Sequence, residues 1–298
     1  MAVFQPKKIL VPLDFSKTSL SALDGALAIS KKTGADLLLL HVSEGLSQNL
    51  EPGYFVHPPT MIDYQVSFIE QSNKHLAAIA GKMKAETTGK IKTYTETGTV
   101  HSTIRNFANQ EKVDLIVMGT HGVSGVKEFF VGSNTFRVIR DSKCPVLSIK
   151  KKTPKNPFRK ILMPFRDKPH SREKVNYAID VALLFSSEIY VLGVDTEQTA
   201  AHKKKIQLEA KQIKEIVSKK NIKCLTTVIS RGYAGDVVLD HAKKIEADLL
   251  ISMSDLDKLN IFEYFTGPFS QQIVNHSPIP VLSIRPRFNT DTIDLRFY

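Results

Sequence analysis

The chain has 298 residues, of which 42% are hydrophobic and 24% charged, a composition typical of a folded globular protein rather than a disordered one. No apolar stretch approaches the roughly 18 residues that a membrane-spanning helix needs, and the first residues lack the apolar core of a signal peptide. Two cysteines do not make a disulfide framework or a metal site. We therefore expect a cytoplasmic protein without a membrane partner.

The formal net charge of +11 raises the question of nucleic-acid binding. The excess lysines are scattered, for example over Lys203–Lys205, Lys211–Lys220 and Lys150–Lys152. On helices such lysines usually form a solvated face, and an anionic ligand or surface partner is the alternative. Zinc spacing, RNA-recognition signatures and interleaved aromatic and basic residues are missing, so the sequence does not indicate specific nucleic-acid recognition.

The first elements along the chain are apolar runs separated by a helical pattern. Lys8–Asp14 and Leu37–Val42 are typical of buried strands. Between them, Ser16 is a candidate helix cap and Gly34 a candidate helix end. The apolar stripe of this helix consists of Leu20, Leu23, Leu27 and Ala28.

The alternation of strands and helices continues up to residue 150. A loop rich in turn residues (45–60) precedes a long helix whose apolar face is Ile62, Val66, Ile69, Leu76, Ile79 and Met83. The further predicted elements are a strand at Ile91–Thr97, a helix around Ile104 and Phe107, a strand at Val113–Met118 and a strand within Cys144–Lys150. Apolar strands that alternate with helices indicate a parallel sheet covered on both faces.

The same plan restarts in the second half of the chain. The matching pairs are Lys160–Pro164 with Lys8–Pro12, Val191–Val194 with Leu39–Val42, Gly232 with Gly98, Glu246–Ile251 with Lys112–Val117, and Pro280–Ile284 with Pro145–Ile149. Landmarks in the same order predict two tandem α/β units. We place unit one at residues 1–150 and unit two at 151–298, with a polar, proline-bearing linker at 151–157.

A glycine-rich loop follows the fourth strand of unit one. Gly119, Gly122 and Gly125 punctuate it, and the next helical segment opens with Gly132–Thr135. Glycine lets the backbone approach an anion closely, and a helix N-terminus offers free N–H groups and the positive end of the helix dipole. The loop is therefore a candidate phosphate cradle, and a structural turn is the alternative.

Three strand ends should meet near this loop if the sheet is doubly wound, because ligands of open α/β sheets bind outside the carboxyl ends of the strands. The three strands end near Asp14, Val42 and Gly119. The Asp14 carboxylate could accept hydrogen bonds from an adenine amino group or a ribose hydroxyl, or it could only cap the following helix. Ser133 and Asn134 offer hydroxyl, amide and backbone donors to phosphate.

These residues resemble a known family. Gly119–Gly122, followed after nine residues by Gly132–Ser133, is similar to the G-x2-G-x9-G-[S/T] nucleotide-binding motif of universal stress proteins. The opening Lys8–Ser16 and the terminal strands also resemble that family, and the resemblance covers nearly the whole chain twice. It implies two Rossmann-like (adenine-nucleotide α-hydrolase-like) units, each a five-stranded parallel sheet with helices on both faces. It also implies ATP binding in members with the intact motif, and homodimerisation through the last strand.

The resemblance implies which residues hold the nucleotide. Pro12, Asp14 and Val42 would hold adenine and ribose. The ribose and phosphates would be held by Met118, Gly119, His121, Gly122, Gly132, Ser133 and Asn134. The sequence shows no dedicated cluster of metal ligands, so a Mg²⁺ or Mn²⁺ ion would arrive on the phosphates of ATP. The loop is not a Walker loop, because no Gly-Lys-[Ser/Thr] follows a glycine at the required spacing.

Unit two departs from this motif at each decisive point. Arg166 stands at the position of Asp14, and Met253 at that of Gly119. The remaining differences are Asp255 for His121, Leu256 for Gly122, and Pro268 in place of serine after Gly267. Larger side chains would crowd a phosphate, an acidic one would repel it, and proline removes an N–H donor. We therefore expect nucleotide binding in unit one only.

The leading interpretation is an ATP-binding stress-response or signalling protein, and two alternatives stay open. One is a nucleotide-independent interaction module, in which the edge strands Val146–Ile149 and Val281–Ile284 join the units to each other and two chains into a homodimer. The other is a weak ATPase or self-phosphorylating protein, with Ser124 or Ser133 as acceptor. His121 could assist slow hydrolysis, but no second base or nucleophile–base pair is visible, so we assign no catalytic residue.

Overall fold

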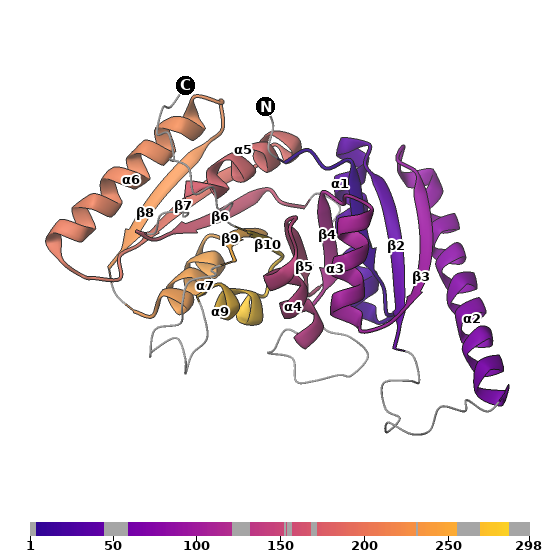
Figure 1. The fold of residues 1–298 in the computed structure, drawn as a ribbon. Helices are drawn as coiled ribbons and strands as arrows, with labels where there is room; N and C mark the ends of the chain where they lie inside the picture. The colour runs from indigo at the N-terminus through magenta and orange to yellow at the C-terminus, as the bar shows by residue number, and fades with distance from the viewer. Residues whose placement is uncertain are drawn as a thin grey trace, which may run out of the picture.

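The computed structural model describes residues 4–44, 59–120, 132–151, 153, 157–167, 172–230, 232–254 and 269–285. Their strands form one ten-stranded sheet in the order β3-β2-β1-β4-β5-β10-β9-β6-β7-β8 (Figure 1). Each unit contributes one contiguous half of this sheet. The predicted α/β class, with two tandem units and a mostly parallel sheet, is confirmed.

The helices and strands alternate as the sequence predicts. Unit one contains β1 (Lys8–Pro12), α1 (Lys17–Thr33), β2 (Asp36–Ser43), α2 (Pro59–Met83), η2 (Lys84–Glu86), β3 (Ile91–Thr97), α3 (Val100–Gln110), β4 (Leu115–Gly119), α4 (Ser133–Asp141) and β5 (Val146–Ile149). Unit two contains β6 (Lys160–Phe165), α5 (Lys174–Phe185), β7 (Glu188–Val194), α6 (Ala200–Ser218), β8 (Cys224–Ile229), α7 (Ala234–Lys244), β9 (Leu249–Met253), α9 (Phe269–His276) and β10 (Val281–Ile284).

Neighbouring strands within each unit are parallel, whereas the two units meet through an antiparallel pair, β5 and β10. Leu147 lies opposite Leu282 at the centre of this junction. The prediction that the two terminal strands join the units is therefore confirmed. The predicted homodimer through the same strands needs a correction: β5 already pairs with β4 on one edge and β10 on the other, so it has no free edge left. The outer edges of the sheet are β3 and β8.

Helices cover both faces of the sheet, which is why its central strands are apolar on both sides. One hydrophobic core contains side chains of α1, α2, α5 and α6, and the other contains side chains of α3, α4, α7 and α9. Successive residues of β1 point into different cores, since Ile9 and Val11 belong to the first and Leu10 to the second. The sheet thus forms the middle of a three-layer arrangement.

The ends of α1 follow the predicted signals. The Ser16 hydroxyl accepts a hydrogen bond from the Ser19 N–H, and Gly34 ends the helix with a left-handed φ of 72°. The predicted apolar stripes were wrong at two positions, because Leu20 is 38% exposed and Val66 is 51% exposed. Each lies about a quarter to a third of a turn from the centre of its helix's buried face, so it only borders the core.

Candidate functional site

A cleft of about 410 Å³ lies at the carboxyl ends of β1, β2 and β4 in unit one. The strand order reverses there, because the chain moves outward from β1 to β2 and β3 and then returns to β4 on the other side of β1. Such a switch point is where open α/β sheets bind their ligands. The predicted residues that line this cleft are Pro12, Asp14, Val42, Met118, Gly119, Gly132, Ser133 and Asn134. The two other predicted residues, His121 and Gly122, lie outside the described residues.

The turn between β1 and α1 forms one wall of the cleft. Asp14 is half-buried there, and its Oδ1 atom accepts a hydrogen bond from the Ser16 N–H at 3.0 Å. The Ser16 hydroxyl in turn accepts from the Ser19 N–H at 3.2 Å, which starts α1. The carboxylate of Asp14 is therefore held in a turn that is built by its own side chain.

Gly119 ends β4 where the first turn of α1 passes closest to it. A side-chain Cβ atom at this position would lie 2.8 Å from the backbone carbon of Thr18 and 2.9 Å from the nitrogen of Ser19. The sequence suggested that this glycine makes room for an anion. The structure adds a separate reason for it, which is the close approach of two backbone segments.

The first turn of α4 also lines the cleft and is bound to the end of β4 by hydrogen bonds. The Gly132 N–H donates to the Thr120 carbonyl at 2.6 Å, and the Thr135 hydroxyl donates to the Gly119 carbonyl at 2.9 Å. The N–H groups of this turn have no acceptors within the helix. The turn itself contains no acidic residue, so it presents the positive end of the helix dipole to the cleft.

Fewer than half of the residues that line the cleft were assigned a nucleotide contact from the sequence. The additional lining residues are Leu13, Ser19, Leu40, His41, Ser43, Glu44, Phe68, Val100, Ile104 and Thr135. Several of them are apolar residues whose spacing in the sequence predicts burial in the core. Burial periodicity assigns a residue to the interior but does not indicate that a cleft opens beside it. Only the tertiary structure brings Phe68 of α2 and Ile104 of α3 to the same cleft.

Unit two has different side chains at the corresponding place. Arg166 replaces Asp14, and its guanidinium carbon lies 4.2 Å from the centre of the Phe269 ring. Phe269 is the first residue of α9, the counterpart of α4, so this cation–π contact lies where unit one has its cleft. Met253, in the place of Gly119, is buried in the core at 5% exposure. The remaining differences in the motif, at residues 255, 256, 267 and 268, lie outside the described residues.

A buried, hydrogen-bonded pair of side chains occupies the corner between β7 and α6 of unit two. Asp195 Oδ1 lies 2.5 Å from His202 Nδ1, and both residues are at most 6% exposed. The Gln198 N–H also donates to Asp195 Oδ1 at 3.0 Å. Burial alone would raise the pKa of Asp195, but the hydrogen bonds from His202 and the Gln198 N–H outweigh it and lower that pKa. The ionised carboxylate therefore fixes this corner.

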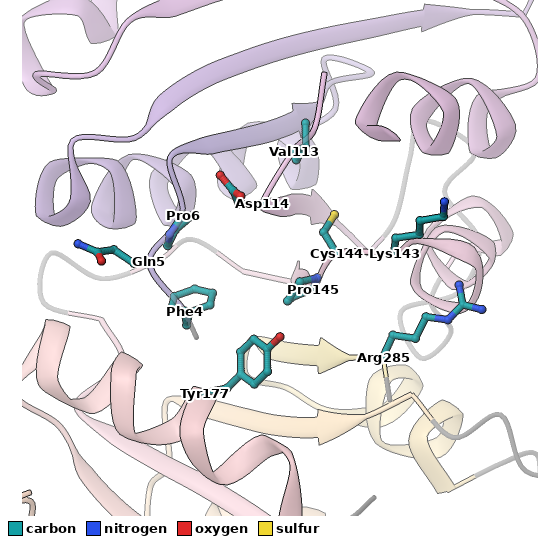
Figure 2. Close-up of a pocket in the computed structure, with 10 residues that line it drawn as sticks. All are labelled: Phe4, Gln5, Pro6, Val113, Asp114, Lys143, Cys144, Pro145, Tyr177 and Arg285. Carbon is teal, nitrogen blue, oxygen red and sulfur yellow. The ribbon is translucent and has the colours of Figure 1, made fainter. Parts of the chain in front are cut away.

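A second cavity, of about 430 Å³, lies between the units at the amino ends of β1, β4 and β5 (Figure 2). Phe4 and Tyr177 form an aromatic pair beside it with ring centres 6.4 Å apart, and the Phe4 N–H donates to the Asp180 carboxylate at 2.7 Å. Burial raises the pKa of the Cys144 thiol in this cavity to about 11, so the thiol is protonated at neutral pH. We assign this cavity to the seam between the units.

Two further searches concern only the part of the chain that the structure describes. In that part no group of three or more His, Cys, Asp or Glu side chains is placed to hold a metal ion. No helix in it combines the length and the apolar character that crossing a bilayer requires.

Comparisons with known proteins agree with the tandem architecture. The model of the universal stress protein family matches residues 6–150 and again residues 157–285. A universal stress protein of Methanocaldococcus jannaschii is 33% identical over 147 residues, which are 49% of this chain and 82% of that protein. One of Bacillus subtilis is 32% identical over 145 residues, 48% of this chain and 98% of its own.

A solved structure shares the whole fold. The crystal structure of a universal stress protein from Archaeoglobus fulgidus aligns with 95% of this chain and 97% of its own, with a TM-score of 0.74 and 20% sequence identity. This similarity extends over both units. The chain therefore belongs to the universal stress protein family, as a tandem two-domain member.

Proposed function

We propose that unit one binds ATP in the cleft between β1, β2, β4 and α4, that unit two binds none, and that the protein acts in stress response or signalling. The observation that carries the proposal is an internal contrast. Unit one brings an acidic residue, Asp14, and the N-terminus of α4 to the same cleft, whereas unit two places Arg166 against Phe269 in the equivalent position. The intact motif of unit one is the one that the family resemblance links to ATP.

The cleft fits an adenine nucleotide in size and chemistry. Its volume of about 410 Å³ falls in the range of about 300–1,000 Å³ that is typical of small-molecule sites. Leu40, Ile104 and Met118 offer apolar surface for a base. Asp14 supplies an acceptor for a hydroxyl or amino group, while the first turn of α4 supplies N–H donors for phosphate oxygens.

A metal ion in this site would depend on the nucleotide for most of its ligands. Mg²⁺ and Mn²⁺ prefer oxygen ligands, and the carboxylates among the described lining residues are Asp14 and Glu44. We therefore expect the ion to be held by phosphate oxygens and water, and to add little affinity of its own for the protein.

Binding to the folded state would couple nucleotide concentration to the stability of unit one. A ligand present at 100 times its dissociation constant stabilises the folded state by about 2.7 kcal/mol. Such a shift is large compared with the marginal stability of most domains. We infer that the protein signals through a nucleotide-dependent change in the stability of unit one or in the assembly of the protein. Assembly of two chains would need a surface other than β5 and β10, since these strands pair with each other.

Equilibrium titration of the purified protein with ATP tests the proposal. We expect one site per chain, and we expect it to be lost in Asp14→Ala. The matched control is Arg166→Ala, the same kind of change at the equivalent position of unit two, which should leave stoichiometry and affinity unchanged. Absence of binding at millimolar ATP would refute the proposal and favour a nucleotide-independent interaction module. Release of ADP on the time scale of nucleotide exchange would instead indicate a weak ATPase.

A further inference from the structure

His41 of β2 is a buried histidine whose ring points toward the turn that carries Asp14. It is 7% exposed, and its Nδ1 atom lies 2.7 Å from the carbonyl oxygen of Leu13. Because a carbonyl oxygen can only accept, Nδ1 must carry the proton of this hydrogen bond. The other ring nitrogen, Nε2, is buried and has no hydrogen-bond partner among the described residues. The single hydrogen bond of this imidazole is thus directed at the residue before Asp14.

The same ring also contacts the residue after Asp14. The Phe15 ring stacks on His41 with centres 4.7 Å apart and an angle of 26° between the planes. Phe15 has a φ of 62°, in the left-handed region that bulky residues rarely adopt without support from their surroundings. The Leu13 N–H donates to the Leu40 carbonyl at 2.8 Å, so both backbone groups of Leu13 are bound to β2.

We propose that His41 is a positioning residue for the nucleotide site. It fixes the chain on both sides of Asp14, on one side by a hydrogen bond and on the other by ring stacking. It thereby sets where the carboxylate lies relative to α4. The proposal rests on the proposed ATP binding of unit one for its ligand, whereas the clamp itself is a property of the protein alone.

Unit two has lost this clamp together with the acid that it would hold. The strand registers match, because Pro12 pairs with Leu40 in unit one and Pro164 pairs with Leu192 in unit two. Gly193 therefore stands at the position of His41. A side chain there would begin 2.5 Å from the Cγ2 atom of Ile206, so α6 occupies the space that the imidazole has in unit one. The imidazole and the acidic residue are present together in one unit and absent together from the other.

The alternative is a histidine that only fills the core. In that case its loss would lower stability and would reduce nucleotide affinity no more than any comparable core truncation in β2. Leu39→Ala supplies that comparison, because Leu39 is fully buried in the same strand and belongs to the core on the same face. His75→Ala supplies a second one, because His75 meets the Phe15 ring edge-on at 5.3 Å and is exposed.

The experiment measures the ATP dissociation constant and the free energy of unfolding for these variants under conditions where all are folded. We expect His41→Ala to raise the dissociation constant at least tenfold, and His41→Asn to restore part of the loss, since an amide can donate to the Leu13 carbonyl. Leu39→Ala and His75→Ala should change the ATP dissociation constant less than twofold.

A second readout needs no nucleotide. Amide hydrogen exchange of residues 13–19 should become at least tenfold faster in His41→Ala and stay unchanged in His75→Ala, in the absence of ATP. If the wild type binds no ATP, the proposed function fails while this measurement still decides whether the clamp exists. Equal effects of His41→Ala and Leu39→Ala on ATP affinity and on amide exchange of residues 13–19 would overturn the positioning role.

Discussion

Lys150 and Asn275 are joined across the boundary between the units: the Lys150 ammonium donates to the Asn275 carbonyl at 2.8 Å. The reciprocal contact runs from Arg285 Nη1 to the Asp141 carbonyl, at 3.5 Å. Both cations follow the last strand of their own unit, and both carbonyls lie in the last turn of the other unit's final helix. Such carbonyls lack intrahelical donors and lie at the negative end of the helix dipole. Each unit thus caps a helix of the other.

Replacing Lys150 by Met should lower the free energy of unfolding by about 1 kcal/mol, the typical contribution of a hydrogen bond to a charged partner near a helix end. The apolar side chain of methionine preserves the packing of the lysine methylene groups. The decrease in the free energy of unfolding therefore measures the contribution of the helix-capping hydrogen bond. Lys151→Met, at the exposed neighbouring residue, should stay within about 0.5 kcal/mol of wild type. Denaturant titration measures both. Equal effects of the two variants would show that the contact contributes nothing.

Removal of His202 should destabilise unit two strongly, by about 3 kcal/mol, because it leaves the buried carboxylate of Asp195 without the hydrogen bond from its side-chain partner. The matched control is Lys204→Ala, an exposed residue of the same helix, which should have little effect. Thermal or denaturant unfolding measures the difference. A loss below about 1 kcal/mol would mean that the pair is not held as the structure has it.

The stability of the wild type should also depend on pH through Asp195. Its pKa in the folded protein lies below its ordinary value of 3.8, so its stabilising contribution is present above that value. The contribution is lost as the pH falls further, through the lower folded-state pKa. Unfolding measured between pH 6 and pH 2 should therefore show a decline below about pH 4 that is shallower in Asp195→Asn. Identical pH profiles would contradict the lowered pKa.

Two glycine substitutions should have opposite effects. Gly119→Ala should cost about 1–3 kcal/mol, since its Cβ would meet backbone atoms of Thr18 and Ser19 that cannot move alone. Gly81→Ala, in α2, has open space around it and should stabilise the protein by about 0.5–1 kcal/mol. Free energies of unfolding for both variants test this contrast. A neutral Gly119→Ala would show that α1 does not pack against β4 as closely as described.

The two thiols should react slowly in the native protein. Burial raises the pKa of Cys144 and of Cys224 to about 11, and the thiolate is the reactive form. At pH 7.5 a thiol-specific reagent should label both far more slowly than it labels the unfolded chain. The rate for Cys144 is the more informative one, since this residue lines the cavity between the units. Labelling of Cys144 at the rate of a free thiol would contradict its raised pKa.

Much of the fold was predictable because buried parallel strands appear as continuous apolar runs and because the same landmarks occur twice. The cleft was predictable because strand ends converge at a switch point. The contacts by which His41 holds the chain on both sides of Asp14 were not predictable. His41 is 28 residues from Leu13, and no local sequence pattern links the two. The same limit applies to β5 and β10. The sequence indicated that these edge strands could join the units, but their antiparallel register, with Leu147 opposite Leu282, depends on how the two units are placed.

The antiparallel junction of β5 and β10 has a consequence for how this protein can change over time. In a two-fold assembly of identical chains every substitution appears in both copies, so a site cannot be altered on one side alone. In this protein the two units are encoded by separate parts of one chain, and they remain paired at that junction, where Val281 lies opposite Ser148. Unit two can therefore carry Arg166 and Met253 at the positions of the unit-one cleft while it still pairs with the sheet of unit one.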